Sequence, residues 1–212
     1  MHPGAELSFQ FLACGHADRL DHAPASADQD PLLRFALDPD QSPHPREIVE
    51  NLADRAHFPS VHQTEIDDFE FSVDGHMATQ RVKGRALLPG GGVDRFGSTT
   101  TYHGPGLLLM RMGGVMQNYM IVAHTPVDSM SLELRMGVML KNVAAATEME
   151  RLVALYMKNL KAGFEDDIRI WENKLYRDVP VLCDGDGPIT QLRRWYRQFY
   201  VAREQPLAEQ RA

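Results

Sequence analysis

Between residues 65 and 140, apolar side chains alternate with polar ones, which is the pattern of half-buried β-strands. Phe69, Phe71 and Val73 alternate along one strand, Asp74–Gly75 is a hairpin turn signal, and a second strand follows from Met77. Further strands are predicted near residues 95–102, 106–112, 116–124 and 129–139, with glycines 90–92 as a connecting turn. Together these segments predict one antiparallel sheet.

From residue 143 to 175, apolar positions recur at the spacing of a helix face, and Gly163 is a position at which this long helix can divide in two. A last helix is predicted over about residues 189–202, with an aromatic stripe that packs on the body. The pattern therefore predicts an α+β fold in which the antiparallel sheet wraps a long C-terminal helix.

The composition indicates one globular domain, because the 212 residues are 43% hydrophobic and 24% charged. Residues 1–44 have apolar islands only at 7–11 and 32–37 and are predicted to be poorly ordered, which places the folded domain at 45–203 and a tail at 204–212. The net charge of -7 argues against a nucleic-acid partner. No apolar run reaches the roughly 18 residues of a membrane span. Two distant cysteines offer no disulfide framework and indicate the cytoplasm.

One carboxylate and two imidazoles stand close together in the segment that contains Asp54, His57 and His62. Asp54 and His57 are three residues apart and share a face of the helix predicted to begin near Arg46. His57 and His62 are five apart, so Pro59 is expected to bend the chain and bring the two rings together. Two imidazoles alone leave zinc, copper, nickel and iron open as the bound ion.

A third metal ligand is predicted on the long helix. Asp167 falls within the apolar stripe of that helix, whereas Asp166 falls on the solvated side. A buried carboxylate needs a partner, and a metal ion is one such partner. Two histidines and one carboxylate with open positions form the facial triad of non-haem iron(II) oxygenases.

Longer motifs surround these residues at both ends of the chain. The first motif is Asn51-x-x-Asp54-x-x-His57-Phe58-x-x-Val61-His62. The later motifs are Asp167-Ile-x-Ile-Trp171-Glu-Asn-Lys, Pro180-x-Leu182-Cys-x-Gly185-Asp-Gly187-Pro188-Ile189 and Arg194-Trp195-Tyr-x-Gln198-Phe199-Tyr200. Together they resemble the catalytic domain of Rieske-type non-haem iron oxygenases, in particular the oxygenase components of 3-ketosteroid 9α-hydroxylases and the cholesterol 7-desaturases. The resemblance runs from about Pro45 to Val201 and implies a helix-grip (START-like) fold with a deep pocket between sheet and helix.

The resemblance also implies an activity. His57, His62 and Asp167 would hold a mononuclear Fe(2+), and Asp54 would carry electrons toward it. The implied reaction is O2-dependent hydroxylation or desaturation of a steroid-like apolar substrate by an oxidoreductase of the monooxygenase type, and a homotrimer is an assembly that the resemblance allows. By their proximity in sequence, Asn51 and Trp171 are predicted to lie near the site or line the substrate pocket, with core packing as the alternative for Trp171.

A Rieske cluster needs Cys-x-His followed by Cys-x-x-His. Cys14-Gly-His16 has the spacing of the first half, but no second half follows, so we expect no [2Fe-2S] cluster in this chain and a separate Rieske or ferredoxin-type electron donor. Two other interpretations are a metal-free helix-grip module that binds a hydrophobic ligand and an inactive, truncated oxygenase fragment. Burial of three polar side chains argues against the metal-free module.

Methionines are frequent in the predicted sheet: Met110, Met112, Met116, Met120, Met130, Met136 and Met139. They suit a pocket for a bulky apolar ligand and an irregular core equally well. His103 and His124, at strand ends, are interpreted as surface or hydrogen-bonded histidines and not as ligands.

Overall fold

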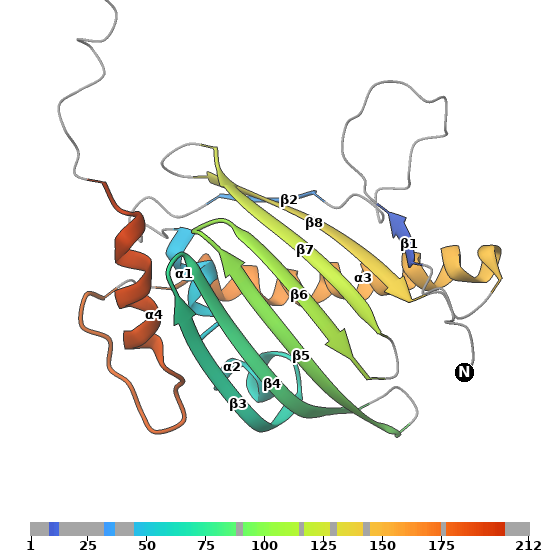
Figure 1. The fold of residues 1–212 in the computed structure, drawn as a ribbon, viewed down its shortest axis with the longest axis horizontal. Coiled ribbons are helices and arrows are strands. Elements are labelled where there is room, and N and C mark those ends of the chain that lie inside the picture. The colour runs from blue at the N-terminus through green and yellow to red at the C-terminus, as the bar shows by residue number, and fades with distance from the viewer. Residues whose placement is uncertain are drawn as a thin grey trace, which may run out of the picture.

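The computed structural model describes residues 9–12, 32–36, 45–87, 91–114, 117–127, 131–141, 145–174 and 177–201. Eight antiparallel strands form one sheet in the order β1-β8-β7-β6-β5-β4-β3, and β2 also pairs with β8 (Figure 1). The strands are β1 (Phe9–Leu12), β2 (Leu32–Ala36), β3 (Thr64–Asp74), β4 (Met77–Leu87), β5 (Val93–His103), β6 (Leu107–Gly113), β7 (Asn118–Pro126) and β8 (Ser131–Lys141). The predicted antiparallel sheet is therefore confirmed.

The hairpin predicted at Asp74–Gly75 joins β3 to β4, with Asp74 opposite Met77. Gly75 has φ +52, a left-handed conformation that glycine adopts without strain and that a tight hairpin turn requires. From β3 to β8 each strand pairs with the next one in the chain, so the connections are local. The strands predicted after the hairpin correspond to β5 through β8.

Two strands lie within the first 44 residues, which were predicted to be poorly ordered. β1 pairs with residues 138–141 of β8, and β2 pairs with residues 131–135 of the same strand. The open edge of a sheet has unpaired backbone N–H and C=O groups, with which a short apolar segment can pair. Pairing of this kind leaves no periodic pattern in the sequence of the segment. The apolar islands at 7–11 and 32–37 thus contribute strands to the sheet.

The described helices are α1 (Pro45–Glu50), α2 (His57–Val61), α3 (Ala146–Trp171) and α4 (Ile189–Tyr196). α3 continues through Gly163, so the predicted possible break of the helix at this residue is wrong. A glycine inside a helix costs roughly 1 kcal/mol, and packing of α3 along the sheet offsets this cost. α4 is shorter than the predicted helix and passes into a 3-10 turn at Arg197–Phe199. Among the described residues, no helix is long and apolar enough to cross a membrane.

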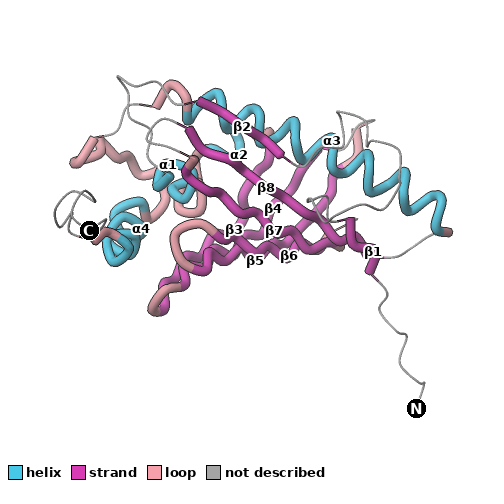
Figure 2. Tube along the Cα trace, turned by 90° about the horizontal axis from the view of Figure 1, so that it is seen from above, coloured by secondary structure: helices cyan, strands magenta, loops and turns pink. Residues whose placement is uncertain are grey.

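Helix α3 lies along one face of the sheet (Figure 2). The main core forms there, where even-numbered side chains of β7 and β8 meet α3; it includes Met120, Val122, Leu134, Met136, Met149, Val153, Ile168 and Trp171. A second core joins α1 and α4 to β4 and β5 through residues such as Leu52, Tyr102 and Trp195. Met120 and Met136 are thus core residues, while Met116 and Met130 lie outside the described part of the chain.

Candidate metal centre

The segment that carries the two histidines consists of two short helices and not one. α1 ends at Glu50, a turn follows, and α2 begins at His57, so Asp54 lies in the turn and does not share a helix face with His57. The Asp54 carboxylate accepts hydrogen bonds from the main-chain N–H groups of Ala56, at 3.0 Å, and His57, at 3.2 Å. These bonds satisfy N–H groups that have no partner at the beginning of a helix.

Pro59 does not bend the chain, because it lies in the first turn of α2. At that position the missing N–H costs no helical hydrogen bond. His57 is the first residue of α2 and His62 follows its last residue, and the centroids of the two rings are 5.2 Å apart. The chain then turns into β3 through Gln63, which has φ 51. The short helix with its sharp exit brings the rings together, where a proline bend was expected.

Asp167 extends from α3 toward these rings. Its residue is 7% exposed, and its Oδ1 lies 3.4 Å from Nε2 of His62. Asp166 is exposed and pairs instead with Arg169 at 3.2 Å. The expected burial of Asp167 and exposure of Asp166 are therefore confirmed. This arrangement raises the pKa of His62, because Asp167 accepts its hydrogen bond and offsets the effect of burial.

His57 is oriented by the main chain of the preceding turn. Its Nδ1 lies 2.5 Å from the carbonyl oxygen of Asp54, which can only accept, so Nδ1 carries the proton and Nε2 is left unprotonated. Metal-binding histidines commonly donate their second ring N–H to a carbonyl in this way. Burial lowers the pKa of His57, which favours the neutral ring that a metal requires.

The donor set of these three residues fits a metal ion. One ligand atom from each of His57, His62 and Asp167 lies within 4.8 Å of the others. Two ligand atoms each about 2.1 Å from one ion stand roughly 3.0–3.5 Å apart at ordinary coordination angles, which matches the separation between His62 and Asp167. Two imidazoles and a carboxylate suit iron, zinc or another transition metal better than magnesium or calcium.

Asn51 and Trp171, predicted near the site or in the pocket, are brought together by the fold. The Trp171 indole N–H donates to the Asn51 side-chain oxygen at 3.2 Å, and Trp171 is 1% exposed within the main core. Trp171 follows Asp167 by one helical turn, so this bond ties the turn before α2 to the helix that carries the carboxylate. Whether either residue lines a substrate pocket stays a prediction.

A buried cluster of ion-paired side chains, which the sequence analysis did not predict, stabilises the turn between α1 and α2. Lys174 Nζ lies 2.9 Å from a carboxylate oxygen of Glu47 and 2.9 Å from one of Glu50, and Arg193 contacts both oxygens of Glu50, at 2.5 and 3.2 Å. Burial alone would raise the pKa of Glu50, but the hydrogen bond from Arg193 and the charge of Lys174 hold it below its ordinary value. The cluster joins α1, the end of α3 and α4. The only sequence signal was a pair of acidic residues in an apolar helix.

Gly187 is a second residue whose importance was missed. A β-carbon at this position would lie 1.8 Å from the carbonyl oxygen of Ala53 and 3.3 Å from the N of Arg55. The loop before α4 therefore passes directly against the turn that contains Asp54. Sequence analysis assigned the segment 184–188 only to a turn, because close contact between two backbones leaves no periodic pattern.

A polar hollow of about 350 Å³ opens beside Asp54. Its other lining residues are Glu50, Lys174, Arg177, Pro180, Val181, Leu182, Asp186, Ile189 and Arg193. Val181 is 94% exposed and Leu182 42%. The Asp54 side of the site therefore opens at the surface, whereas the Asp167 side is buried.

His124 differs from its expected role as a surface or hydrogen-bonded histidine. It is buried, and neither ring nitrogen has a hydrogen-bond partner among the residues that the structure describes. Its ring packs edge-on against Tyr102, with centroids 5.5 Å apart. Burial lowers the pKa of His124 to about 4.

Solved oxygenase structures share this fold. Dicamba monooxygenase bound to 3,6-dichlorosalicylic acid aligns with a TM-score of 0.52 at 13% identity, over 83% of this chain and 62% of that one. NdmA of Pseudomonas putida, solved with caffeine, aligns with a TM-score of 0.50 at 17% identity, over 83% of this chain and 55% of that one. The fold is that of the catalytic domain of Rieske-type oxygenases.

The chain belongs to the family of the 3-ketosteroid 9α-hydroxylase C-terminal domain, whose family model matches residues 29–200. A probable 3-ketosteroid-9-alpha-monooxygenase oxygenase component of Rhodococcus rhodochrous is 34% identical over 174 residues, covering 74% of this chain and 44% of that protein. A 3-ketosteroid-9-alpha-monooxygenase oxygenase component of Mycobacterium tuberculosis is 32% identical over 169 residues, with the same coverage. Cholesterol 7-desaturase of Caenorhabditis elegans is 45% identical over 49 residues, covering 23% of this chain and 11% of that protein. The chain thus spans less than half the length of these relatives.

Proposed function

We propose that this chain is the catalytic domain of an oxygenase component that hydroxylates or desaturates a steroid-like apolar substrate with dioxygen. The observation that carries the proposal is the meeting of His57, His62 and Asp167 at one point, in a chain of the 3-ketosteroid 9α-hydroxylase C-terminal domain family. These three residues would hold a mononuclear Fe(2+). When bound, the iron supplies the site at which dioxygen is reduced for attack on an unactivated C–H bond.

The protein residues prepare the site for that ion. The Asp54 carbonyl fixes the tautomer of His57, so that Nε2 is available as a ligand. Asp167 supplies negative charge from a buried position, where a carboxylate alone would be costly. The bond between Trp171 and Asn51 holds the two ligand-bearing segments in register. The site is therefore organised before a metal binds, which favours affinity.

Electrons would reach the metal from a separate Rieske or ferredoxin-type protein through Asp54. Asp54 contacts His57 twice, once through its carboxylate and once through its carbonyl, and it also faces the surface hollow beside α4. Asp54 therefore lies between a surface that a partner can reach and His57, a proposed ligand of the metal. The proposal also includes the predictions of a cytoplasmic location and of a homotrimeric assembly.

The substrate class follows from the relatives and from the sheet. The named relatives act in steroid chemistry, and the inner face of the sheet is apolar. We also interpret the long α3 against the curved sheet as a helix-grip arrangement, the fold type in which such a ligand lies between helix and sheet.

The test is turnover of a 3-ketosteroid by protein loaded with ferrous iron under anaerobic conditions. A Rieske-type reductant and isotopically labelled dioxygen are then supplied, and the label in the steroid product is measured by mass spectrometry. Asp54→Asn keeps the oxygen that accepts the bonds at the beginning of α2, so it should retain iron and lose labelled product, whereas the exposed Asp74→Asn should retain both. Iron binding without any labelled product in the unaltered chain would reject the proposed reaction, and full turnover in Asp54→Asn would remove Asp54 from it.

A further inference from the structure

The face of the sheet opposite α3 carries a groove, here called the outer-face groove, that no described helix covers (Figure 2). One row of side chains crosses it from strand to strand. Arg81 of β4 is paired with Thr99 of β5, Thr99 with Arg111 of β6, and Arg111 with Tyr119 of β7. Paired residues point to the same face of a sheet, so these four side chains share the outer face.

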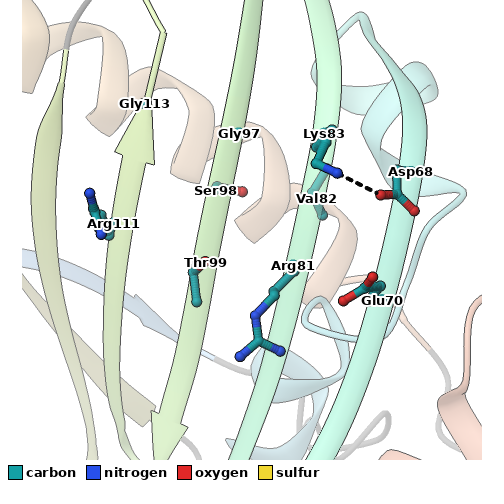
Figure 3. A pocket seen from close by; sticks show the side chains of 10 residues that line it. All are labelled: Asp68, Glu70, Arg81, Val82, Lys83, Gly97, Ser98, Thr99, Arg111 and Gly113. Carbon is teal, nitrogen blue, oxygen red and sulfur yellow. Dashed lines mark hydrogen bonds and ion pairs between the residues drawn. The ribbon is translucent and has the colours of Figure 1, made fainter.

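The β3–β6 side of the groove is polar. A hollow of about 310 Å³ is formed where Gly97 and Gly113 pair and leave no side chain above the strands (Figure 3). Lys83 at its edge already pairs with Asp68 at 3.2 Å. Arg81 stands opposite Glu70 in the register, although the two make no ion pair.

Arg111 differs from these charged neighbours. Both of its cross-strand partners, Thr99 and Tyr119, are uncharged. In the described part of the chain, neither Arg111 nor Arg81 makes a hydrogen bond or an ion pair, and Figure 3 shows the two on either side of Thr99. A guanidinium group without a protein partner is free to bind an anion, and its planar fork matches a carboxylate.

The β6–β8 side of the groove is apolar. A second hollow, of about 440 Å³, is lined by Leu109, Ile121 and Met139 among others, and it shares Thr99 and Arg111 with the polar hollow. Leu109 is 41% exposed and Ile121 40%. Arg111 therefore lies where the apolar hollow meets the polar one, in a pocket of a size that suits a small ligand.

We propose that the outer-face groove binds an amphipathic carboxylate, with its apolar chain over Leu109 and Ile121 and its carboxylate on Arg111 and Thr99. The site is distinct from the metal centre, which lies among α2 and α3 on the other side of the sheet. Charge complementarity selects the ligand class: the apolar hollow alone would accept an uncharged chain, whereas the unpaired guanidinium at its end favours an anion. The ligand is the free acid and not a lipid surface, because one carboxylate can reach Arg111 on β6 alone, whereas an anionic bilayer would also lay its charges over Asp68 and Glu70 on β3.

The probe is decanoate below its micellar concentration, titrated into the full chain by isothermal calorimetry, with methyl decanoate as the uncharged match. Decanoate should bind at least about fivefold more tightly than its ester, since only the acid can use the guanidinium. Arg111→Gln should reduce decanoate binding to the level of the ester, and Leu109→Ser should weaken both ligands. Arg151→Gln removes the same charge from an exposed residue of α3 and should change neither.

Three results would overturn the proposal: equal affinity for decanoate and its ester, unchanged decanoate binding in Arg111→Gln, or binding only to vesicles of an anionic phospholipid. A loss of decanoate binding in Arg151→Gln equal to that in Arg111→Gln would also overturn it, because it would show an effect of net charge alone. Iron content of the same variants is measured in parallel. It should equal that of the unaltered chain, so failure of the groove and failure of the metal centre give different results.

Discussion

Replacing Gly187 by alanine should disturb the metal centre from outside it. The added methyl carbon would lie 1.8 Å from the carbonyl oxygen of Ala53, next to Asp54. A β-carbon essentially never lies closer than 3.0 Å to a neighbouring heavy atom, so one of the two backbone segments must move by about 1.2 Å. The three nearest atoms all belong to the backbone of Ala53 and Arg55, so the strain cannot be relieved by a change of rotamer.

The movement has two expected consequences. Overpacking of this kind costs about 1–3 kcal/mol of folding free energy, and the contact with backbone argues for the upper half of that range. The Asp54 carbonyl also holds Nδ1 of His57, so its displacement should weaken metal binding about 10–100-fold, as loss of an outer hydrogen bond to a ligating histidine does.

The assays are guanidinium denaturation of the metal-free protein and titration with Fe(2+) or Co(2+). Gly185→Ala is the matched control, because a β-carbon there would meet only the Cys183 sulfur, at 3.9 Å. Stability and metal affinity in Gly187→Ala that both equal those of Gly185→Ala would refute the close approach and the link to His57.

Two further predictions concern buried charge. Arg193→Met removes both bonds to Glu50 and leaves Lys174 as the only cationic partner of Glu50 among the described residues, so it should cost about 3 kcal/mol in urea denaturation. The double variant with Glu50→Gln should cost less than the sum of the single changes, and strict additivity would contradict the coupling. For His124, burial lowers the pKa in the folded state from its ordinary 6.5 to about 4. As the pH falls, the unfolded chain therefore takes up the proton before the folded chain does. The free energy of unfolding should decrease as the pH drops from 6.5 toward 4, by at most about 3 kcal/mol. His124→Phe should keep the ring packing on Tyr102 and remove this part of the acid dependence; an unchanged pH profile in that variant would show that other groups cause it.

Local patterns in the sequence predicted most of the fold. Alternation located β3 through β8, Asp74–Gly75 located the hairpin, and the helical stripe of α3 distinguished buried Asp167 from exposed Asp166. Each of these signals depends on residues close together in the chain. The pairing of β1 and β2 with β8 could not be predicted in this way, because it depends on a sheet edge that only the folded protein presents.

The sequence predicted which three side chains lie close together, but not how the chain brings them there. His57, His62 and Asp167 do meet, but α2 and the turn at Gln63 bring them together, whereas a bend at Pro59 was expected. We expected a bend at Pro59 because proline has a low helix propensity, but proline breaks a helix only beyond its first turn. The contacts that support the site, such as Gly187 against Ala53, join segments more than a hundred residues apart and leave no local trace.

The measurement that tests the central claim most directly is the iron content of protein loaded with ferrous iron under anaerobic conditions and then freed of excess metal. The unaltered chain and Asp166→Ala should each retain about one iron per chain, and His57→Ala and Asp167→Ala should retain almost none, because they lose a ligand of the proposed triad. No iron in the unaltered chain, or equal retention in Asp166→Ala and Asp167→Ala, would contradict a metal centre at His57, His62 and Asp167.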